Sequence, residues 1–416
     1  MTDTAAVAPR LVTTPREGSV EVIADADALR RFVEAVDRGL PVAIDAERAQ
    51  SFRYSPKAYL IQFRQAGIGT RLLDPIALAG REPLADLSEL SAALNGCEWV
   101  LHAASQDLGC LAEVGLVPNR VFDTELAGRL LSLERVSLSP MLTHYLGVEL
   151  AKAHSADDWS RRPLPPDWLA YAALDVDYLL ELRDAVADDL ADHDKADWAR
   201  QEFEDVVTRF AIPPSNSNDR WRLAKGIKRL RRPRDLAVAQ RLWGVRDDLA
   251  RQLDIAPLRI LSDANLVAAA TAFGHMKPVE VAASIGTQPG FTGRLARRQR
   301  TRWIGAIDSA LRDDPAHWPT RASGHKMPPP RLWERDFPAA AKRWAAARAA
   351  VIEVAEAHDV PVENLMTVAT LGEVVWPDDG DFSEAGLRKT LAAVHSRPWQ
   401  IDLAAPAIAD ALAGVG

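Results

Sequence analysis

The sequence has very little cysteine and no long apolar run. Two cysteines in 416 residues, Cys97 and Cys110, exclude a disulfide framework and lack the spacing of metal ligands, so we expect buried free thiols in a reducing compartment. No stretch approaches the roughly 18 apolar residues of a membrane span, and residues 1–19 lack the apolar core of a secretory signal. The sequence therefore predicts a cytoplasmic protein without membrane contact, beginning with a flexible tail over 1–19.

The composition is typical of folded domains, with 48% hydrophobic and 26% charged residues. At about 150 residues per domain, the length predicts two or three domains. Proline-rich or Ser/Asn-rich stretches predict linkers at 209–219 and 313–337. The predicted domains are 20–208, 220–312 and 338–416.

Charge is unevenly spread along the chain. Residues 1–210 carry 21 Lys/Arg against 35 Asp/Glu, whereas residues 220–326 carry 21 against 9. This asymmetry favours an acidic, metal-binding catalytic unit joined to a module that binds a polyanion. Ordinary drift in composition between domains is the alternative.

Strand and helix patterns alternate only in the first domain. Short apolar runs predict strands, and amphipathic stretches between and after them predict helices, which together indicate an α/β layered domain. The predicted strands are 41–44, 59–63, 70–74 and 99–102, and the predicted helices are 24–39, 84–95, 105–115, 123–133 and 167–190. The second and third domains are predicted to be all-helical, and similar Asp…Pro turns at 254–257 and 359–361 suggest that they are weak copies of each other.

Asp45 and Glu47 follow the apolar run 41–44. Residues two apart on a strand point to the same face, so both carboxylates can reach one cation. The pair alone has little specificity, because the chain has 58 acidic residues and such spacings arise by chance.

Two further segments carry candidates. Asp107 follows a predicted strand where a helix is expected to begin, although a carboxylate there could equally serve the helix dipole. Tyr171 and Asp175 lie four residues apart in a helical segment, on one face; a half-buried tyrosine beside a solvated acid is the alternative. Together, four carboxylates and a phenol supply what a two-metal phosphodiesterase requires: hard oxygen ligands for two ions about 4 Å apart, and a group that orients water.

These residues fall in three motifs that resemble the tyrosine branch of the ribonuclease D family, in the DEDD exonuclease superfamily. The motifs are Asp45-Ala46-Glu47 with Tyr59-Leu60-Ile61-Gln62-Phe63, then 102–108 with 122–125, and 159–176. The histidine branch would carry His where this chain has Ala170. The resemblance covers about residues 20–205 and implies a ribonuclease H-like α/β exonuclease domain, a mixed sheet flanked by helices. The helical remainder resembles tandem HRDC (helicase and ribonuclease D C-terminal) domains.

The resemblance implies a role for each candidate. Asp45, Glu47 and Asp175 would hold the ion that activates water, and Asp45 would bridge to a second ion. Asp107 would hold that second ion, largely through water. Tyr171 would position the nucleophile. The implied cofactors are two divalent ions, Mg²⁺ or Mn²⁺.

Other positions are implied to support the site. His102, Gln106 and Asp123 would maintain its shape rather than contact metal. The family often has an apolar residue after the first-motif glutamate, placed against the terminal base, and this chain has Arg48 there. Base stacking at that position is therefore in doubt. Arg48 could instead contact a phosphate or be an exposed surface residue.

Two basic clusters lie in the helical half, within 221–234 and 294–302. Such clusters bind phosphates without reading sequence, with an affinity that falls steeply as salt rises; a solvated charged surface is the alternative. The expected RNA-binding residues are Lys225, Lys228, Arg229, Arg231, Arg232, Arg297 and Arg298. The tryptophans of this half are expected to anchor cores.

The resemblance implies a monomeric, metal-dependent 3′→5′ exoribonuclease that releases nucleoside 5′-monophosphates from RNA, with tRNA precursors and other structured RNAs as substrates. A 3′→5′ DNA exonuclease is one alternative, which a contact to the 2′-hydroxyl would distinguish. A catalytically silent scaffold that binds nucleic acid is another. Truncation near residue 212 is expected to leave a folded, active core.

Overall fold

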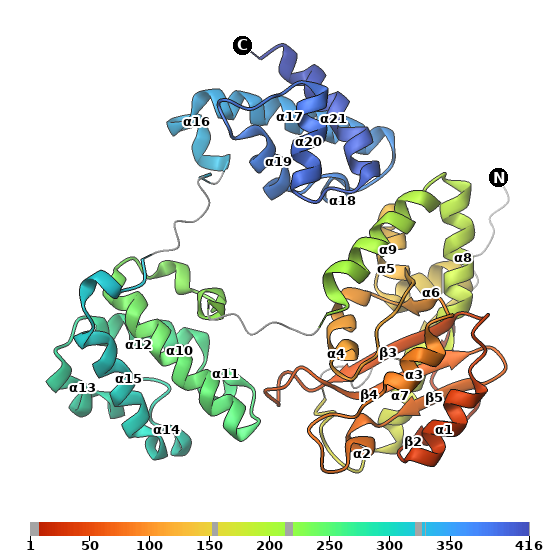
Figure 1. Ribbon diagram of the computed structural model, residues 1–416, viewed down its shortest axis with the longest axis horizontal. Helices are drawn as coiled ribbons and strands as arrows, with labels where there is room; N and C mark the ends of the chain where they lie inside the picture. Colours follow the sequence, from red (N-terminus) through yellow and green to blue (C-terminus); the bar gives the residue numbers. More distant parts are fainter. Residues whose placement is uncertain (1–7, 152–156, 213–218, 321–326, 329, 416) are drawn as a thin grey trace.

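The structure is a computed structural model that describes residues 8–151, 157–212, 219–320, 327–328 and 330–415. Along the chain, an α/β domain is followed by two helical domains (Figure 1). Residues 1–7 of the predicted tail and the central parts of both predicted linkers, 213–218 and 321–326, lie outside the described residues.

Six strands of the described chain form one mixed sheet, in the order β2-β5-β4-β3-β6-β7. β3 pairs antiparallel with β4 and parallel with β6, as expected for the predicted mixed sheet. A separate parallel pair joins β1 to β8. The strands are β1 (Arg10–Val12), β2 (Glu21–Ile23), β3 (Val42–Arg48), β4 (Ala58–Gln65), β5 (Gly69–Leu73), β6 (Trp99–Leu101), β7 (Val121–Asp123) and β8 (Val148–Leu150).

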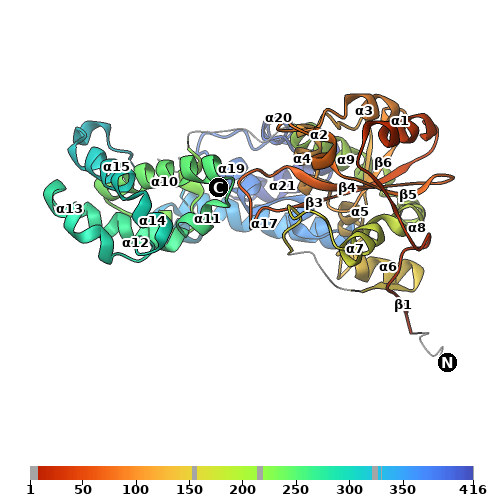
Figure 2. The same ribbon diagram turned by 90° about the horizontal axis from the view of Figure 1, so that it is seen from below.

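β3 is the strand that determines the position of the first motif. Val42, Ala43 and Ile44 are fully buried because helices cover both faces of the sheet, and a strand buried on both faces has a continuous apolar run. Figure 2 shows α1 and α3 on one side of this sheet and α6 and α7 on the other. The register of β3 against β4 shifts between Glu47 and Arg48. Such irregularities bend a strand and re-aim its side chains.

Part of the segment predicted as a flexible tail forms regular structure. Arg10–Val12 make up β1, because the backbone pairs with β8 and Val12 is buried. The backbone N–H of Arg16 donates to Asp177, which also attaches the following residues to α7.

The helices of the α/β domain are α1 (Ala26–Ala35), α2 (Pro75–Ala79), α3 (Ser88–Leu94), α4 (Leu108–Glu113), α5 (Thr124–Leu130), α6 (Leu138–Leu146), α7 (Pro166–Asp177), α8 (Leu179–Asp192) and α9 (Ala196–Phe210). The stretch 167–190, predicted as one helix, contains a break at Tyr178, whose φ and ψ of −118° and 7° are not helical. The break lets α7 pack across β4 and β5 while α8 packs against α5 and α6.

The first helical domain has its own core, around Trp221, Phe273 and Trp303. Its helices are α10 (Pro233–Leu253), α11 (Pro257–Ile260), α12 (Asp263–Gly274), α13 (Pro278–Ser284), α14 (Arg294–Arg298) and α15 (Arg300–Arg312). The second has α16 (Trp333–Asp336), α17 (Pro338–Ala357), α18 (Val362–Leu365), α19 (Val368–Val375), α20 (Glu384–Ala393) and α21 (Pro398–Ala413). Within the described ranges, none of the helices has the length and apolar character that a membrane crossing needs.

The two helical domains share a succession of elements. A long helix ends at Asp254 in one and near Asp359 in the other, both with a left-handed backbone, φ 46° and 48°. A short helix follows, and the next helix is capped by the side chain of Ser262 or Thr367. This shared succession supports the internal repeat that the sequence suggests.

The second helical domain packs on the α/β domain and shares its core. Trp198 of α9 stacks on Trp399 of α21, with ring centroids 4.8 Å apart and planes 17° apart. Glu202 of α9 accepts hydrogen bonds from Arg397 Nε, at 2.7 Å, and from Trp399 Nε1, at 2.8 Å. Lys195 Nζ donates to the carbonyl of Asp359 at 2.6 Å. These contacts fix α9 against the last domain.

Candidate active site

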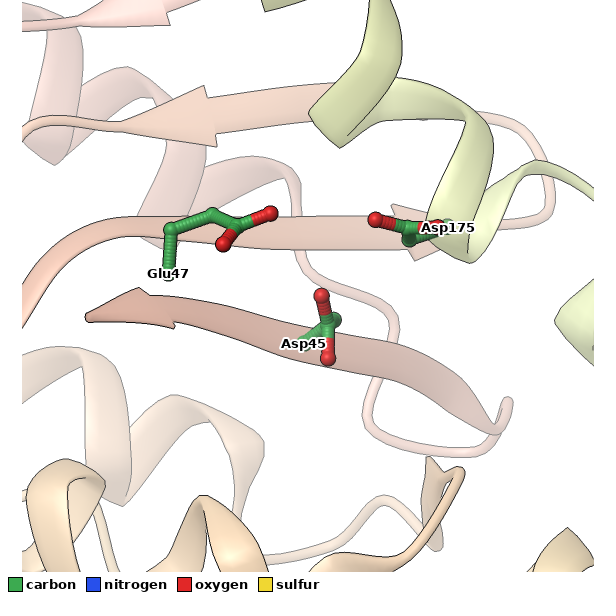
Figure 3. Close-up of side chains that lie close together, drawn as sticks. All are labelled: Asp45, Glu47 and Asp175. Atoms are coloured by element: carbon green, nitrogen blue, oxygen red, sulfur yellow. The ribbon is translucent and has the colours of Figure 1, made fainter. Parts of the chain in front are cut away.

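Three of the predicted carboxylates converge between β3 and α7. Asp45 and Glu47 lie two residues apart on β3 and point to the same face, and α7 brings Asp175 over that face. Oxygens of the three carboxyl groups lie within 4.8 Å of one another. Figure 3 shows the three groups directed toward a common space. The strand spacing predicted that Asp45 and Glu47 share a face, and the family resemblance implied that Asp175, 130 positions later, joins them.

Tyr171 lies one turn before Asp175 on α7. This helix begins at Pro166, a residue whose fixed φ suits the first helical position and which needs no hydrogen-bond acceptor there. The Tyr171 hydroxyl hydrogen-bonds to the carboxylate of Asp175, as the four-residue spacing allows. Trp159 packs near the phenol ring, with centroids 6.4 Å apart. The phenol is thus held at the edge of the carboxylate cluster.

Asp107 is brought to the same cluster from a different element. It ends the 3₁₀ turn Ala104–Gln106 and immediately precedes α4, so it lies just before the α-helix rather than in its first turn. Its side chain is almost completely buried and shares a hydrogen bond with Asp45. All four predicted carboxylates therefore meet at the end of β3.

Burial raises the pKa of every one of these carboxyl groups, and for Glu47, Asp107 and Asp175 the charges of neighbouring carboxylates raise it further. For Glu47, burial and then the charges of Asp45, Asp175 and Asp107 raise the pKa to about 10. The pKa values of Asp107 and Asp175 are raised for the same reasons, burial first and Asp45 second. Burial and the neighbouring carboxylates also raise the pKa of the Tyr171 phenol. Such a cluster favours a bound cation, which removes the repulsion, and its hard oxygen atoms suit Mg²⁺ or Mn²⁺.

Gln62 is a site residue whose role the sequence did not predict. It lies directly opposite Asp45 in the β3–β4 register, and residues opposite each other share a face of the sheet. Its side chain is fully buried, and neither amide atom has a hydrogen-bond partner among the described residues. A buried, unsatisfied amide is costly unless water or a ligand satisfies it, so this donor and acceptor also fit a site that binds a hydrated ion. Its only sequence signal was its place in the first motif.

The three predicted supporting residues lie on or beside the segment that leads to Asp107. Asp123 is buried and accepts hydrogen bonds from the backbone N–H groups of Ala103 and Ala104, at 3.0 and 2.8 Å, which fixes the loop before Asp107. His102 Nδ1 lies 2.9 Å from the hydroxyl of Thr124, and burial lowers the His102 pKa to about 4. The side chain of Gln106 is exposed, and its backbone carbonyl accepts a hydrogen bond from Arg48.

Arg48 is directed into the site, so the alternative of a free surface arginine does not hold. Its Nη1 donates to the carbonyl of Gln106 at 2.7 Å, and Nη2 lies 3.4 Å from Asp107 Oδ1. Only 24% of the side chain is exposed. The cation therefore neutralises part of the carboxylate charge from the side of Asp107.

A small cavity of about 190 Å³ adjoins Glu47. It is lined by residues 46–52, which include the loop that leaves β3, and by Asp157. The first helical domain holds this loop: Ala256 N–H donates to the carbonyl of Phe52 at 3.0 Å, and Arg259 Nε donates to that of Ser51 at 2.7 Å. One wall of the cavity is thus fixed by a neighbouring domain.

The structure does not bring the predicted RNA-binding cations to the carboxylates. All lie exposed on the first helical domain, five near the start of α10 and two on α14. Arg232 is engaged within that domain, by an ion pair with Asp235 at 2.9 Å and a contact with His275. The set is Lys225, Lys228, Arg229, Arg231, Arg232, Arg297 and Arg298, and its contact with RNA stays a prediction.

Three family models match successive parts of the chain. Residues 20–191 match a "3'-5' exonuclease" family, residues 235–307 match the HRDC domain, and residues 326–412 match a "3' to 5' exonuclease C-terminal domain". The exonuclease and HRDC matches lie within the predicted first and second domains, while the predicted domain limits themselves stay predictions.

Related proteins cover most of the length. Ribonuclease D of Nitrobacter hamburgensis is 28% identical over 287 residues, 67% of this chain and 70% of that protein. A crystal structure of a protein from Bifidobacterium adolescentis superposes with a TM-score of 0.84 at 33% identity, over 98% of this chain and all of that one. Escherichia coli RNase D, described as an exoribonuclease involved in structured RNA processing, shares the fold with a TM-score of 0.69 at 24% identity, over 95% of this chain and 99% of that one.

Proposed function

This chain belongs to the ribonuclease D family of metal-dependent 3′→5′ exoribonucleases, and we propose that it removes nucleoside 5′-monophosphates one at a time from RNA 3′ ends. The observation that supports this most strongly is the convergence of Asp45, Glu47 and Asp175 within 4.8 Å, with Asp107 and Tyr171 in contact with members of that group.

The proposed cofactors are two divalent ions, Mg²⁺ or Mn²⁺. Asp45, Glu47 and Asp175 would hold one, and Asp45 and Asp107 the other. Bound there, the two ions would lower the pKa of the attacking water and neutralise charge on the leaving oxygen. Among the described residues, four carboxylates face Arg48, and this excess of negative charge fits the donor set.

Side chains of the protein would orient the water and bind the substrate. The Tyr171 hydroxyl, held by Asp175, would orient the attacking water toward the scissile phosphate. The buried amide of Gln62 would hydrogen-bond to water next to Asp45. Arg48 can turn from Asp107 to a phosphate oxygen of the substrate, because guanidinium groups bind phosphate in a fork geometry.

The proposed substrates are structured RNA precursors, tRNA among them, and the proposed active form is a monomer. The fold shared with Escherichia coli RNase D supports the choice of structured RNA. The HRDC domain supports binding to nucleic acid outside the carboxylate site. Cytoplasmic location stays a prediction from the sequence.

A 3′-end degradation assay tests this proposal. Purified protein is incubated with 5′-labelled single-stranded RNA or matched DNA, with Mg²⁺ or Mn²⁺, and with EDTA as control. We expect an RNA ladder that shortens from the 3′ end only when metal is present. Faster loss of DNA would favour the DNA exonuclease, and bound but intact RNA would favour the silent scaffold.

A further inference from the structure

A second cavity, outside the carboxylate site, lies in the first helical domain. It is a groove of about 1030 Å³ between α10 and α15. Small residues Gly244, Ala306 and Ser309 line it, and the space above Gly244 is open, with no atom within 4 Å of the position a Cβ would take. The volume reaches the upper end of the range for small-ligand pockets, about 300–1,000 Å³, so the groove can hold a segment of a chain.

Cations dominate the border of this groove, which is lined by four arginines against two carboxylates. The arginines are Arg220, Arg241, Arg251 and Arg302. Of the two carboxylates, Asp247 is already engaged, by Arg251 at 3.0 Å and by the hydroxyl of Tyr54. Within the described part of the chain, Arg302 donates to a neutral partner, the amide oxygen of Gln252, at 2.9 Å. Arg241 is paired with Asp313 at 2.9 Å, and Arg251 also lies 3.4 Å from Asp248. The four arginines therefore face three carboxylates, which leaves a net positive charge of one, and RNA phosphate would replace Asp313 as the partner of Arg241.

An aromatic ring accompanies these cations. Trp243 lines the groove and is only partly buried, whereas Trp221 beside it is 1% exposed and belongs to the core. An accessible indole ring next to guanidinium groups is the combination that binds single-stranded nucleic acid, the ring by stacking on a base and the cations by contact with phosphates. Arg302 belongs to the basic cluster 294–302 predicted from the sequence, whereas none of the seven residues named there as RNA-binding lines this groove.

The groove is fixed relative to the carboxylate site by the loop that leaves β3. Tyr54 Oη donates to Asp247 Oδ2 at 3.0 Å, so a residue that lines the groove holds this loop. The backbone N–H of Tyr54 donates to Asp254 at 3.3 Å, and Arg259 packs over Phe52 with its guanidinium 4.3 Å from the ring centroid. Since Tyr54 is seven residues from Glu47, the loop can separate the two by at most about 25 Å between Cα atoms.

We propose that the groove between α10 and α15 binds a single-stranded RNA segment on the 5′ side of the scissile nucleotide. Arg241 and Arg302 contact phosphates, and Trp243 stacks on a base. The proposal rests on the proposed exoribonuclease function for the direction of the strand. RNA entering the site from this groove runs along the loop 49–54 to the cavity beside Glu47.

The test compares the full-length double variant Arg241→Gln/Arg302→Gln with Arg312→Gln. Arg312 lies on the same helix, α15, and forms an ion pair with Asp308 at 3.8 Å, so its replacement removes one positive charge outside the groove, half of the charge that the double variant removes. Binding of a labelled 20-nucleotide RNA is measured by anisotropy in EDTA over a range of salt. Hydrolysis of that RNA and of a dinucleotide is measured with Mn²⁺.

We expect the double variant to bind the long RNA about tenfold more weakly at low salt, with a salt slope reduced by about 1.4, about 0.7 for each lost phosphate contact. Its kcat/KM should fall for the long RNA and stay within about twofold of wild type for the dinucleotide. Arg312→Gln should match wild type throughout. Unchanged binding in the double variant, or an equal loss in Arg312→Gln, would overturn the proposal.

An equal loss of kcat/KM on both substrates would also overturn it, because the substitutions would then act on the catalytic site rather than on the groove. If wild type degrades neither RNA, the exoribonuclease function fails. The binding comparison in EDTA requires no catalysis and still decides whether the groove binds RNA.

Discussion

Arg48 Nη2 lies 3.4 Å from Asp107 Oδ1, so the residue that follows the first motif pairs with a carboxylate of the second. The family resemblance implied an apolar residue at this position, and the chain carries an internal cation there instead. The pair is mostly buried and lies beside Asp45, where a second metal ion would bind.

Removing this cation should strengthen metal binding. We expect Arg48→Met to lower the Kd for Mn²⁺ about threefold to tenfold, because the guanidinium no longer competes for Asp107 and a partly exposed pair contributes about 1 kcal/mol. Calorimetric titration with Mn²⁺ measures this, and Arg48→Lys serves as the control that retains the charge. An Arg48→Met protein with the wild-type Kd would contradict a role for Arg48 as a competitor of the metal.

Tyr171→Phe should affect the chemical step rather than binding. The substitution removes the hydroxyl that Asp175 holds, while the ring keeps its packing against Trp159. We expect single-turnover hydrolysis to slow about 100-fold, as for a misplaced reactant, with an unchanged RNA Kd in EDTA. Loss of binding with a normal single-turnover rate would mean that Tyr171 positions RNA instead of water.

Metal-free protein should lose stability as pH rises. The pKa of Glu47 is about 10 in the folded protein against an ordinary value of 4.5. Between these values the folded state binds more protons than the unfolded state, so the free energy of unfolding falls with rising pH. In EDTA, the Tm should therefore fall from about pH 5.5 to pH 8.5, and Glu47→Gln should flatten this dependence.

Metal reverses the trend, because cation binding displaces the same protons. Mn²⁺ should raise the Tm more at pH 8.5 than at pH 5.5 in wild type, and much less in Glu47→Gln. A Tm that is independent of pH in wild type, with equal Mn²⁺ effects at both values, would be inconsistent with a protonated carboxylate cluster.

Truncation after residue 212 should produce a less stable protein, in contrast to the independent core expected from the sequence. It exposes Trp198, which stacks on Trp399, and leaves the nearly buried Glu202 without Arg397. We expect the Tm to fall by about 5 °C or more and the fragment to self-associate, measured by calorimetry and sedimentation. A monomeric fragment with the full-length Tm would show that the shared core contributes nothing.

The sequence was sufficient for the carboxylate cluster because spacing dictates its local geometry. Asp45 and Glu47 share a strand face, and Tyr171 and Asp175 share a helix face, whatever the rest of the chain does. The motif order and the family resemblance supplied the long-range contact. The central strands β3, β4 and β6 were predictable for a similar reason: their apolar runs are buried on both faces of the sheet.

Features that depend on contacts distant in sequence were not predictable. The three residues of β1 have no strand pattern of their own and form only because β8 pairs with them. Tyr178 interrupts a helical pattern because the two halves pack on different partners. Of the four arginines of the α10–α15 groove, Arg302 belongs to the predicted cluster 294–302. Arg220, Arg241 and Arg251 lie outside both predicted clusters, and only the packing of α10 on α15 brings them together.

Substitution of Asp175 tests the central claim most directly. Asp175→Asn keeps the size of the side chain and removes one ligand charge, and Asp184→Asn on α8, with 70% of its side chain exposed, is the matched control. With an unchanged circular dichroism spectrum and retained RNA binding, Asp175→Asn should hydrolyse RNA about 1,000-fold more slowly than wild type, equivalent to several kcal/mol of transition-state stabilisation. Asp184→Asn should match wild type. A folded Asp175→Asn protein that keeps activity within about tenfold of wild type would contradict a metal-dependent exonuclease site at these carboxylates.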